Sequence, residues 1–237
     1  MGYFSIEFYK RYLPEVGPSE LIIFGLISVL VILFSIVIHE LAHLIVSRRL
    51  GVVVAEIGFN FFGGIVNLKE DITIPKNEIK ICIVGPLTNL IIGTVFLGLS
   101  RSLLLNFHTY ITTSFYFFAL SNGIIAFFNL IPAFPLDGGR VLRAFLWDRT
   151  LDYGFSTKVV SKISSILGYS ILICGIYFIF TLQLAHAIWL ILVSSIFIIS
   201  AIQTNRKSTS IFLKMLRNEY DKIDKPVEEN PKCFVIS

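Results

Sequence analysis

Apolar residues form five long runs along the chain, and the charged residues, glycines and prolines concentrate between them. Each run is about 20 residues long, and a helix of that length spans the hydrocarbon core of a bilayer. The pattern therefore predicts five transmembrane helices. Their expected limits are 21–47, 79–100, 110–131, 164–180 and 184–202.

The stretches outside these runs divide the rest of the chain. Residues 1–20 are too polar for a span and form an N-terminal segment, whereas 21–202 make up one membrane domain. Residues 203–237 are expected to be a cytoplasmic tail. Within the tail, four apolar residues fall on one helical face among basic neighbours, which is typical of an interfacial helix on an anionic leaflet. They are Ile211, Phe212, Met215 and Leu216.

The composition excludes an ordinary soluble globule. Hydrophobic residues make up 55% of the 237 residues and charged residues only 15%, where soluble domains carry about 25%. The net charge of +4 comes from charges between the apolar runs, so it indicates membrane topology and not a nucleic-acid surface. Three scattered cysteines, Cys82, Cys174 and Cys233, show no pairing or metal-binding pattern.

The basic residues predict the orientation in the membrane. Of the 20 Lys and Arg residues, ten follow the first and third spans, seven lie in the tail, and three fall on the opposite side. Because basic residues favour the cytoplasmic side, we expect the N-terminus outside and the C-terminus in the cytoplasm of a multi-pass protein of the cell membrane.

The segment 51–75 is predicted to be a short β-hairpin. It contains three consecutive valines, the Gly63-Gly64 pair and the closing Pro75, which favour short strands punctuated by glycine. Irregular backbone at membrane depth must be covered by protein or line a wet cavity. The hairpin edge could therefore pair with an extended substrate, although a plain cytoplasmic hairpin without a substrate role remains an alternative.

The strongest chemical signal is the run from His39 to His43, which has the HExxH pattern. On a helix, residues four apart lie one above the other, so both imidazoles can bind one ion while Glu40 reaches a water molecule beside it. Ionisable residues inside an apolar span are costly and are usually functional. Solvated histidines at a helix end are the alternative interpretation.

A tetrahedral zinc site needs a third protein ligand, and Asp137 is the best candidate. Prolines break the third span before Pro132, and Gly138-Gly139 frees the backbone directly after the carboxylate. His108 and His186 are expected on the opposite side of the membrane and are poor candidates.

Four ordered motifs carry a resemblance to a known family. They are HELAH at 39–43, Phe62-Gly63-Gly64 in the hairpin, GPLTN at 85–89 and FNLIPAFPLDGGRVLRA at 128–144. Together they resemble the site-2 proteases, which are intramembrane zinc metalloproteases that cut membrane-anchored proteins. The resemblance implies an all-α polytopic membrane protein with about five transmembrane helices, a three-helix catalytic core and a short membrane-associated β-hairpin.

The resemblance also implies the roles of individual residues. One zinc ion per chain would be bound by His39, His43 and Asp137, with Glu40 as the catalytic base. Asn129 could donate a hydrogen bond to the oxyanion, and Asn89 could orient the substrate. Either asparagine could instead tie helices together. The hairpin residues Phe62, Gly63 and Gly64 are the remaining substrate-binding candidates.

The expected function is hydrolysis of a peptide bond in or near a transmembrane segment. Partners would be membrane-anchored substrates such as a tethered transcription regulator or an anti-sigma factor, the lipid bilayer and a second copy of the chain. The chain departs from many members of the family because neither an additional first helix, a PDZ insertion nor a cystathionine-β-synthase-type module is evident. A divalent-metal transporter and an inactive membrane chaperone are the competing hypotheses.

Overall fold

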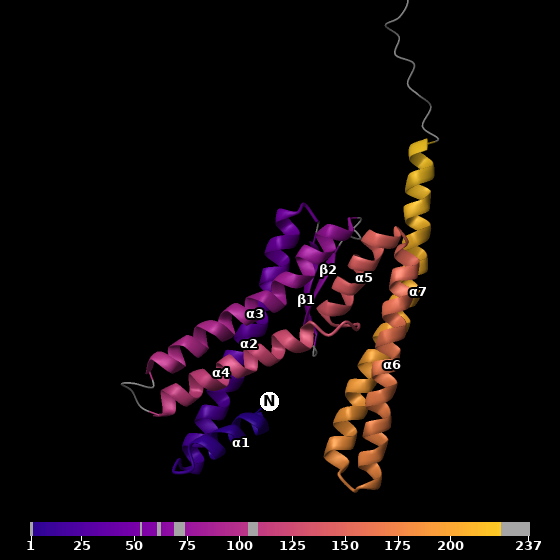
Figure 1. Cartoon of the computed structure of the whole chain (residues 1–237). Helices are drawn as coiled ribbons and strands as arrows, with labels where there is room; N and C mark the ends of the chain where they lie inside the picture. The colour runs from indigo at the N-terminus through magenta and orange to yellow at the C-terminus, as the bar shows by residue number, and fades with distance from the viewer. Residues whose placement is uncertain (1, 53, 61–62, 69–73, 104–108, 224–237) are drawn as a thin grey trace, which may run out of the picture.

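The computed structural model describes residues 2–52, 54–60, 63–68, 74–103 and 109–223, and side chains are described for most of them. This part of the chain forms seven helices and one pair of strands (Figure 1). The elements are α1 (Gly2–Tyr12), α2 (Pro18–Arg49), β1 (Val54–Asn60), β2 (Gly63–Leu68), α3 (Pro75–Leu103), α4 (Thr109–Asn129), α5 (Asp137–Thr150), α6 (Tyr153–Phe180) and α7 (Leu184–Ile223).

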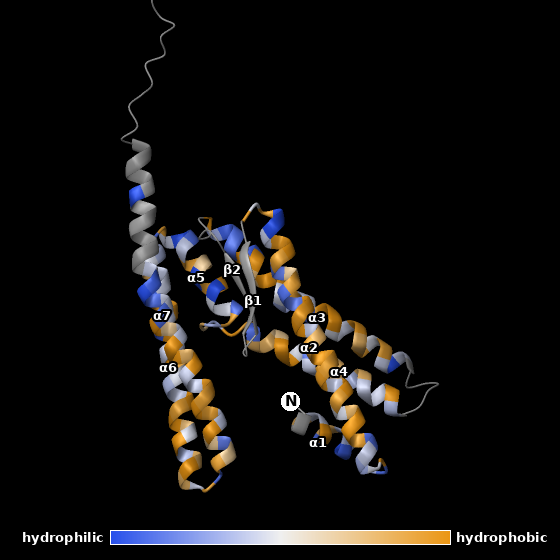
Figure 2. Ribbon diagram, turned by 180° about the vertical axis from the view of Figure 1, so that it is seen from behind, coloured by the Kyte–Doolittle hydropathy of each residue, from blue (hydrophilic) through white to orange (hydrophobic). Residues whose placement is uncertain are grey.

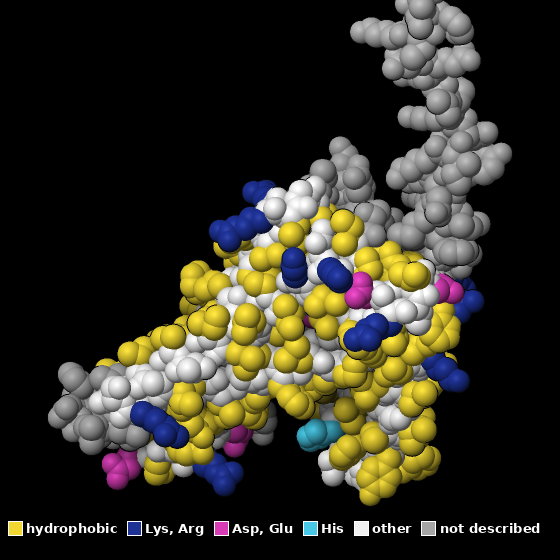
Figure 3. Space-filling view, turned by 45° about the horizontal axis from the view of Figure 1, so that its top comes forward, with side chains coloured by type: hydrophobic (Ala, Val, Ile, Leu, Met, Phe, Trp, Pro, Cys, Tyr) yellow, Lys and Arg dark blue, Asp and Glu magenta, His cyan; other side chains and the backbone are white. Residues whose placement is uncertain are grey.

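Five of the helices are long and apolar enough to cross a membrane, as the hydrophobic pattern predicts. They are α2, α3, α4, α6 and α7. Much of their length has the colour of hydrophobic residues in Figure 2, and large side chains such as Leu30, Phe34 and Ile173 are about two-thirds exposed. Hydrophobic side chains also spread over much of the face seen in Figure 3. Such an apolar surface is favourable in contact with lipid and unfavourable in contact with water, so the chain is an integral, multi-pass membrane protein.

The N-terminal segment contains a helix that the hydrophobic pattern does not predict. Helix α1 is too short to be a span and packs against α2 and α4 (Figure 1). Its Tyr9 is completely buried, and the Tyr9 ring stacks on Phe24 at a centroid distance of 5.2 Å and tilts against Phe117 at 5.6 Å. The buried cluster around Tyr9 explains why this polar segment is ordered.

Helices α2, α3 and α4 pack side by side as the central layer of the fold (Figure 1). Helices α3 and α4 are antiparallel and approach closely at Gly93, where a Cβ would lie 3.1 Å from the carbonyl oxygen of Ala119. Small residues allow such close approach between helices in a membrane, because dispersion contacts and not the hydrophobic effect hold helices together there. This layer contains the expected three-helix core.

The third span ends at Asn129, close to the predicted break before Pro132, and the chain then turns into α5. The sequence predicts a broken segment here, whereas the structure contains a 14-residue helix. The next span also begins at Tyr153 and not at 164, because the Asp152 side chain accepts a 2.8 Å hydrogen bond from Phe155 N and caps α6. The capping residue, and not the start of the apolar run, sets this helix boundary.

Helices α6 and α7 form an antiparallel hairpin that connects to the rest of the protein mainly through α5 (Figure 1). The two helices approach closely at Gly168, where a Cβ would lie 2.7 Å from Ile198 Cγ1. Helix α7 continues without a break to Ile223, past the predicted end of the fifth span. The proposed interfacial face of the tail involves side chains outside the described set, and the residues after 223 lie outside the described residues.

Strands β1 and β2 connect α2 to α3 and pair in antiparallel orientation. Asn60 pairs with Gly63 and Phe59 with Gly64, and a register irregularity lies between Val54 and Glu56. Strand β2 lies beside α2, the helix that carries the HExxH pattern. Phe62 lies outside the described residues, so the hairpin is described here by its backbone alone.

Candidate metal centre

The two histidines of the HExxH pattern lie in the last third of α2, on its inward face. His39 is 4% exposed and His43 is 7% exposed. Because the residues are four apart on a continuous helix, their rings lie one turn apart, with centroids separated by 4.8 Å. The Nε2 atoms of the two rings are 3.1 Å apart, so both imidazoles point toward the same place.

Asp137 reaches the histidines from a different part of the chain, as the first residue of α5. The turn that delivers it folds back tightly on itself, since a Cβ at Gly139 would lie 2.5 Å from the carbonyl carbon of Ala133. The turn is also tied to α6, because Phe134 N donates a 2.7 Å hydrogen bond to Ser164 Oγ. Gly138 and Gly139, which the sequence suggests free the backbone after the carboxylate, therefore also allow close backbone packing.

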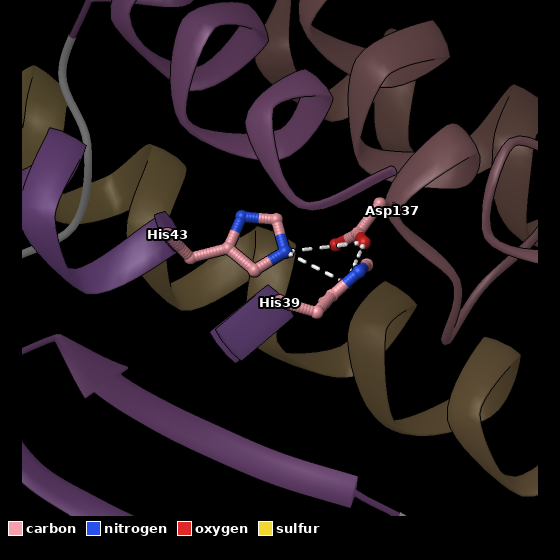
Figure 4. A group of neighbouring side chains, drawn as sticks. All are labelled: His39, His43 and Asp137. Atoms are coloured by element: carbon pink, nitrogen blue, oxygen red, sulfur yellow. Dashed lines mark hydrogen bonds and ion pairs between the residues drawn. The ribbon is translucent and has the colours of Figure 1, made fainter. Parts of the chain in front are cut away.

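The three side chains form a compact set of metal ligands (Figure 4). Asp137 Oδ2 lies 3.1 Å from His39 Nε2 and 3.3 Å from His43 Nε2. Zinc bonds its nitrogen and oxygen ligands at about 2.0–2.2 Å, so neighbouring ligand atoms of a tetrahedral site are about 3.3 Å apart. The separations in the structure therefore match zinc ligation, and His39, His43 and Asp137 fit this ion.

The hydrogen bonding of His43 prepares its ring for a metal. His43 Nδ1 lies 2.6 Å from the carbonyl oxygen of Ile81 on α3. A carbonyl can only accept, so Nδ1 carries the proton and Nε2 presents a lone pair. In metal sites this type of outer contact fixes both tautomer and ring orientation.

The backbone of Gly85 in α3 leaves room at the point where the ligands converge. A Cβ at Gly85 would lie 2.6 Å from His39 Nε2 and even closer to His43 Nε2. No side chain could occupy that position without displacing the imidazoles. The absence of a side chain at Gly85 therefore leaves the space in front of both nitrogen atoms free, which supports the fit of an ion.

The electrostatic surroundings favour an ionised Asp137. Burial opposes ionisation, but the adjacent imidazoles of His39 and His43 outweigh it and lower the pKa of Asp137 below its ordinary range. Asp137 also lies in the first turn of α5, where the partial positive charge of the helix N-terminus favours a carboxylate. The site therefore supplies one negative charge beside the two imidazole rings.

A buried ion network next to the metal centre was not predicted from the sequence. Glu78 of α3 is 1% exposed and forms ion pairs with two arginines of α5, Arg143 and Arg140, the latter at 3.6 Å. Arg143 also donates a 3.0 Å hydrogen bond to the Tyr153 hydroxyl. The sequence assigns both arginines to the cytoplasmic charge bias, but Arg143 is in fact largely buried.

One face of α3 supports every part of the centre. Glu78 holds α5, the Ile81 carbonyl orients His43, Gly85 leaves the central space open and Asn89 contacts His39. These residues are spaced three to four apart and so lie on one side of the helix. The same spacing is visible in the sequence, but only the contacts reveal that this face serves the site.

Asn89 lies inside the protein, in contact with both α2 and α4. It is completely buried, its Oδ1 lies 2.5 Å from His39 Nδ1, and its Nδ2 donates a 3.0 Å hydrogen bond to Asn122 Oδ1. Both ends of the amide are thus engaged inside the protein. Asn89 therefore supports a metal ligand, and its expected role in orienting the substrate stays a prediction.

The two remaining polar candidates occupy the edge of the centre. Glu40 follows His39 on α2 and is partly buried, and its carboxyl forms no hydrogen bond with any other described residue. Asn129 is the last residue of α4 and donates a 3.1 Å hydrogen bond to the Ile125 carbonyl. The Glu40 carboxyl is therefore available for proton transfer, and one Asn129 donor is already used within its own helix.

Other potential ligands lie elsewhere. His186 stacks on Phe178 where α6 meets α7, with ring centroids 5.7 Å apart. Cys82 is buried and Cys174 is exposed, and both are free thiols. His108 and Cys233 lie outside the described residues. Among the residues that the structure describes, the one group able to hold a metal is the set formed by His39, His43 and Asp137.

The solved structure of a site-2 protease from Methanocaldococcus jannaschii is similar to this chain. The superposition has a TM-score of 0.57 at 30% sequence identity and covers 86% of each chain. The similarity extends over most of the described fold. The expected relationship to the site-2 proteases is therefore confirmed.

Curated relatives give the same result. A zinc metalloprotease of Methanocaldococcus jannaschii is 37% identical over 187 residues, which is 78% of this chain and 51% of the relative. Stage IV sporulation protein FB of Bacillus subtilis is 27% identical over 195 residues, covering 81% of this chain and 64% of that protein. The chain thus spans about half the length of the first relative. The model of peptidase family M50 matches residues 27–107 and 105–175, and the chain belongs to this family.

Proposed function

We propose that this protein is an intramembrane zinc metalloprotease that hydrolyses a peptide bond in or near the transmembrane segment of membrane-anchored proteins. The observation that carries the proposal is the convergence of His39, His43 and Asp137 at separations of 3.1–3.3 Å. Two of these residues lie inside a membrane-spanning helix. The membership of the chain in peptidase family M50 supports the same reaction.

The proposed chemistry divides between the ion and the side chains. A zinc ion held by these three residues would supply Lewis acidity, which activates water and polarises the scissile carbonyl. Glu40 is the proposed base: its carboxylate removes a proton from the attacking water. The water oxygen then bonds to the carbonyl carbon, the carbon–nitrogen bond breaks, and Glu40 transfers the proton to the leaving nitrogen. The lack of a competing hydrogen bond within the described residues supports this role.

Asn129 is proposed to stabilise the oxyanion of the tetrahedral intermediate. It lies at the end of α4, directly before the turn that carries Asp137. One N–H of its amide donates to Ile125, and an amide has a second N–H available for a substrate oxygen. This role requires no loss of the helical hydrogen bond.

The hairpin is the proposed site for the unwound substrate. A transmembrane helix satisfies its own backbone hydrogen bonds, so a segment must be extended before it can be cut. Strand β2, which begins at Gly63 and Gly64, lies beside α2. An extended segment adding to this two-stranded sheet would gain backbone hydrogen bonds close to the metal ligands. Phe62 remains a proposed contact.

We infer that the end of the molecule that carries the metal centre faces the cytoplasm. The C-terminal end of α2, the start of α3, all of α5 and the start of α6 lie together at this end (Figure 1). The connections at this end hold ten of the 20 Lys and Arg residues, which supports an outside N-terminus and a cytoplasmic C-terminus. Proposed substrates are tethered transcription regulators or anti-sigma factors in the cell membrane, and homo-oligomers are a further proposed state.

Comparison of the wild type with Glu40→Gln tests the proposal. Each protein is reconstituted in liposomes with a solubilised membrane-protein extract, and new peptide termini are identified by mass spectrometry. Zinc content and zinc uptake into the liposomes are measured in parallel. Termini in transmembrane segments are expected with the wild type. The variant should bind zinc equally and cleave at least about 100-fold more slowly, because the base is lost.

Two results would contradict the proposed hydrolase function. One is equal cleavage by the Glu40→Gln variant, which would remove the role of the base. The other is zinc uptake by both proteins without any cleavage, which would identify a metal transporter. Near-zero zinc in the gently purified wild type would contradict the ligand assignment itself.

A further inference from the structure

Three buried side chains, one from each of α2, α3 and α4, form a continuous hydrogen-bonded chain that ends at His39. His39 Nδ1 lies 2.5 Å from Asn89 Oδ1, and Asn89 Nδ2 lies 3.0 Å from Asn122 Oδ1. Asn122 Nδ2 in turn lies 2.9 Å from the carbonyl oxygen of Phe118. Both asparagines are completely buried, so water does not compete for these bonds.

The carbonyl of Phe118 determines the direction of every bond in this chain. A carbonyl oxygen can only accept, so the Asn122 amide must place its NH₂ group toward Phe118 and its oxygen toward Asn89. Asn89 then donates from Nδ2 and presents Oδ1 to His39. Turning either amide around would place two donors or two acceptors against each other in a buried site, which is unfavourable because no water can satisfy them there.

The direction of the chain determines the tautomer of His39. Because Asn89 Oδ1 accepts, His39 Nδ1 must carry the proton, and Nε2 then presents its lone pair toward Asp137 and His43. The Ile81 carbonyl produces the same tautomer in His43 through a direct backbone contact. The tautomers of the two rings are thus set by different contacts. His43 contacts a backbone carbonyl directly, whereas His39 depends on a hydrogen-bonded chain that runs through two asparagines to α4.

The close approach of α3 and α4 makes the chain possible. Gly93 lies one turn after Asn89, and a Cβ at Gly93 would be 3.4 Å from Asn122 Cβ. A larger residue at Gly93 would push α4 away and lengthen the bond between the two amides. The packing of the helices and the hydrogen-bonded chain therefore support each other.

We propose that Asn122 is a positioning residue of the metal centre: acting through Asn89, it holds His39 in the tautomer and ring orientation that present Nε2 to zinc. The proposal rests on the proposed zinc protease function and extends it to a residue that does not contact the ion. Loss of such outer contacts typically weakens metal binding 10- to 100-fold.

The experiment measures zinc affinity of the full-length protein in detergent by competition with a chelator. The variants are Asn122→Leu, Asn89→Leu and the double variant, since leucine is apolar and fills a comparable volume. Each single variant is expected to bind zinc about 10- to 100-fold more weakly. The double variant should be no weaker than Asn89→Leu alone, because both substitutions interrupt the same chain. Additive losses would overturn the proposal.

A control variant separates positioning from general stability. Ser35→Ala removes a 3.0 Å side-chain hydrogen bond to the Val31 carbonyl, one turn before His39, without touching the ring. It should leave zinc affinity unchanged. Equal losses of affinity in Ser35→Ala and Asn122→Leu, or unchanged affinity in Asn122→Leu, would overturn the positioning role.

The tautomer can be observed without any variant. Nitrogen-15 NMR of the metal-free wild type with labelled histidines, at a pH where the rings are neutral, should show His39 protonated at Nδ1. Protonation at Nε2 would overturn the inference even if zinc binds. Conversely, protonation at Nδ1 in a wild type that binds no zinc would support the hydrogen-bonded chain and contradict the proposed function.

Discussion

Gly85 of α3 faces His39 so closely that a Cβ at this position would lie 2.6 Å from His39 Nε2. The same Cβ would be closer still to His43 Nε2. Nitrogen-to-zinc bonds are about 2.0–2.1 Å long, so a methyl group here would compete with an ion for the same space. The absence of one side chain therefore gives both imidazoles access to a shared ligand.

Replacing Gly85 by alanine is expected to abolish zinc binding. The added methyl group would occupy the space in front of both nitrogen atoms and push the rings apart. Zinc content of the purified protein should fall from about one ion per chain to near zero, and proteolysis should be lost with it. The content is measured by mass spectrometry of the metal after gentle purification.

Gly98 provides a matched control on the same helix. A Cβ at Gly98 would meet nothing within 4 Å, so Gly98→Ala should retain zinc and activity. Loss of zinc in both variants would mean that alanine disturbs α3 in general. Full zinc content in Gly85→Ala would show that the central space is larger than the structure indicates.

Removing the buried charge of Glu78 is expected to destabilise the protein strongly. The Glu78 side chain is 2% exposed and pairs with Arg143, whose side chain is 11% exposed. Breaking one partner of a buried pair leaves an uncompensated charge, which costs about 3–5 kcal/mol. Glu78→Gln should therefore lower the free energy of unfolding by about 3 kcal/mol. The unfolding transition in detergent provides the measurement.

The exposed pair of Glu7 and Lys10 is the corresponding control. Its atoms are 3.3 Å apart, but both side chains are about half exposed. Glu7→Gln should change the free energy of unfolding by less than about 1 kcal/mol, because solvent screens such pairs. Equal effects of the two substitutions would show that burial does not strengthen the Glu78 network.

The hydroxyl of Tyr9 is expected to stabilise the packing of α1. It lies 3.0 Å from Ser28 Oγ on α2 and donates to Ser114 Oγ on α4 at 3.3 Å. Tyr9→Phe keeps the ring contacts and removes both hydrogen bonds, at a cost of about 1 kcal/mol. Tyr12→Phe is the control, because Tyr12 is 50% exposed. An unchanged melting temperature in Tyr9→Phe would contradict the contribution of the hydroxyl.

The five spans could be predicted from the sequence because membrane insertion depends on the length and polarity of each segment alone. Helices α1 and α5 could not be predicted in the same way, since both are short. Tyr9 orders α1 by burial against α2 and α4, and Gly139 allows the start of α5 to pack closely against the backbone of Ala133. Tertiary packing, and not local pattern, stabilises such short helices.

The sequence by itself determined that His39 and His43 share one helical face, because residues four apart on a helix must do so. It also identified Asp137 as the expected third ligand, although the distance between His43 and Asp137 cannot be obtained from the sequence. Only the tertiary structure brought the three atoms within 3.1–3.3 Å and placed Asn89, Asn122 and Glu78 around them. Hydrogen bonds and ion pairs between separate helices depend on packing, and packing is a property of the folded chain as a whole.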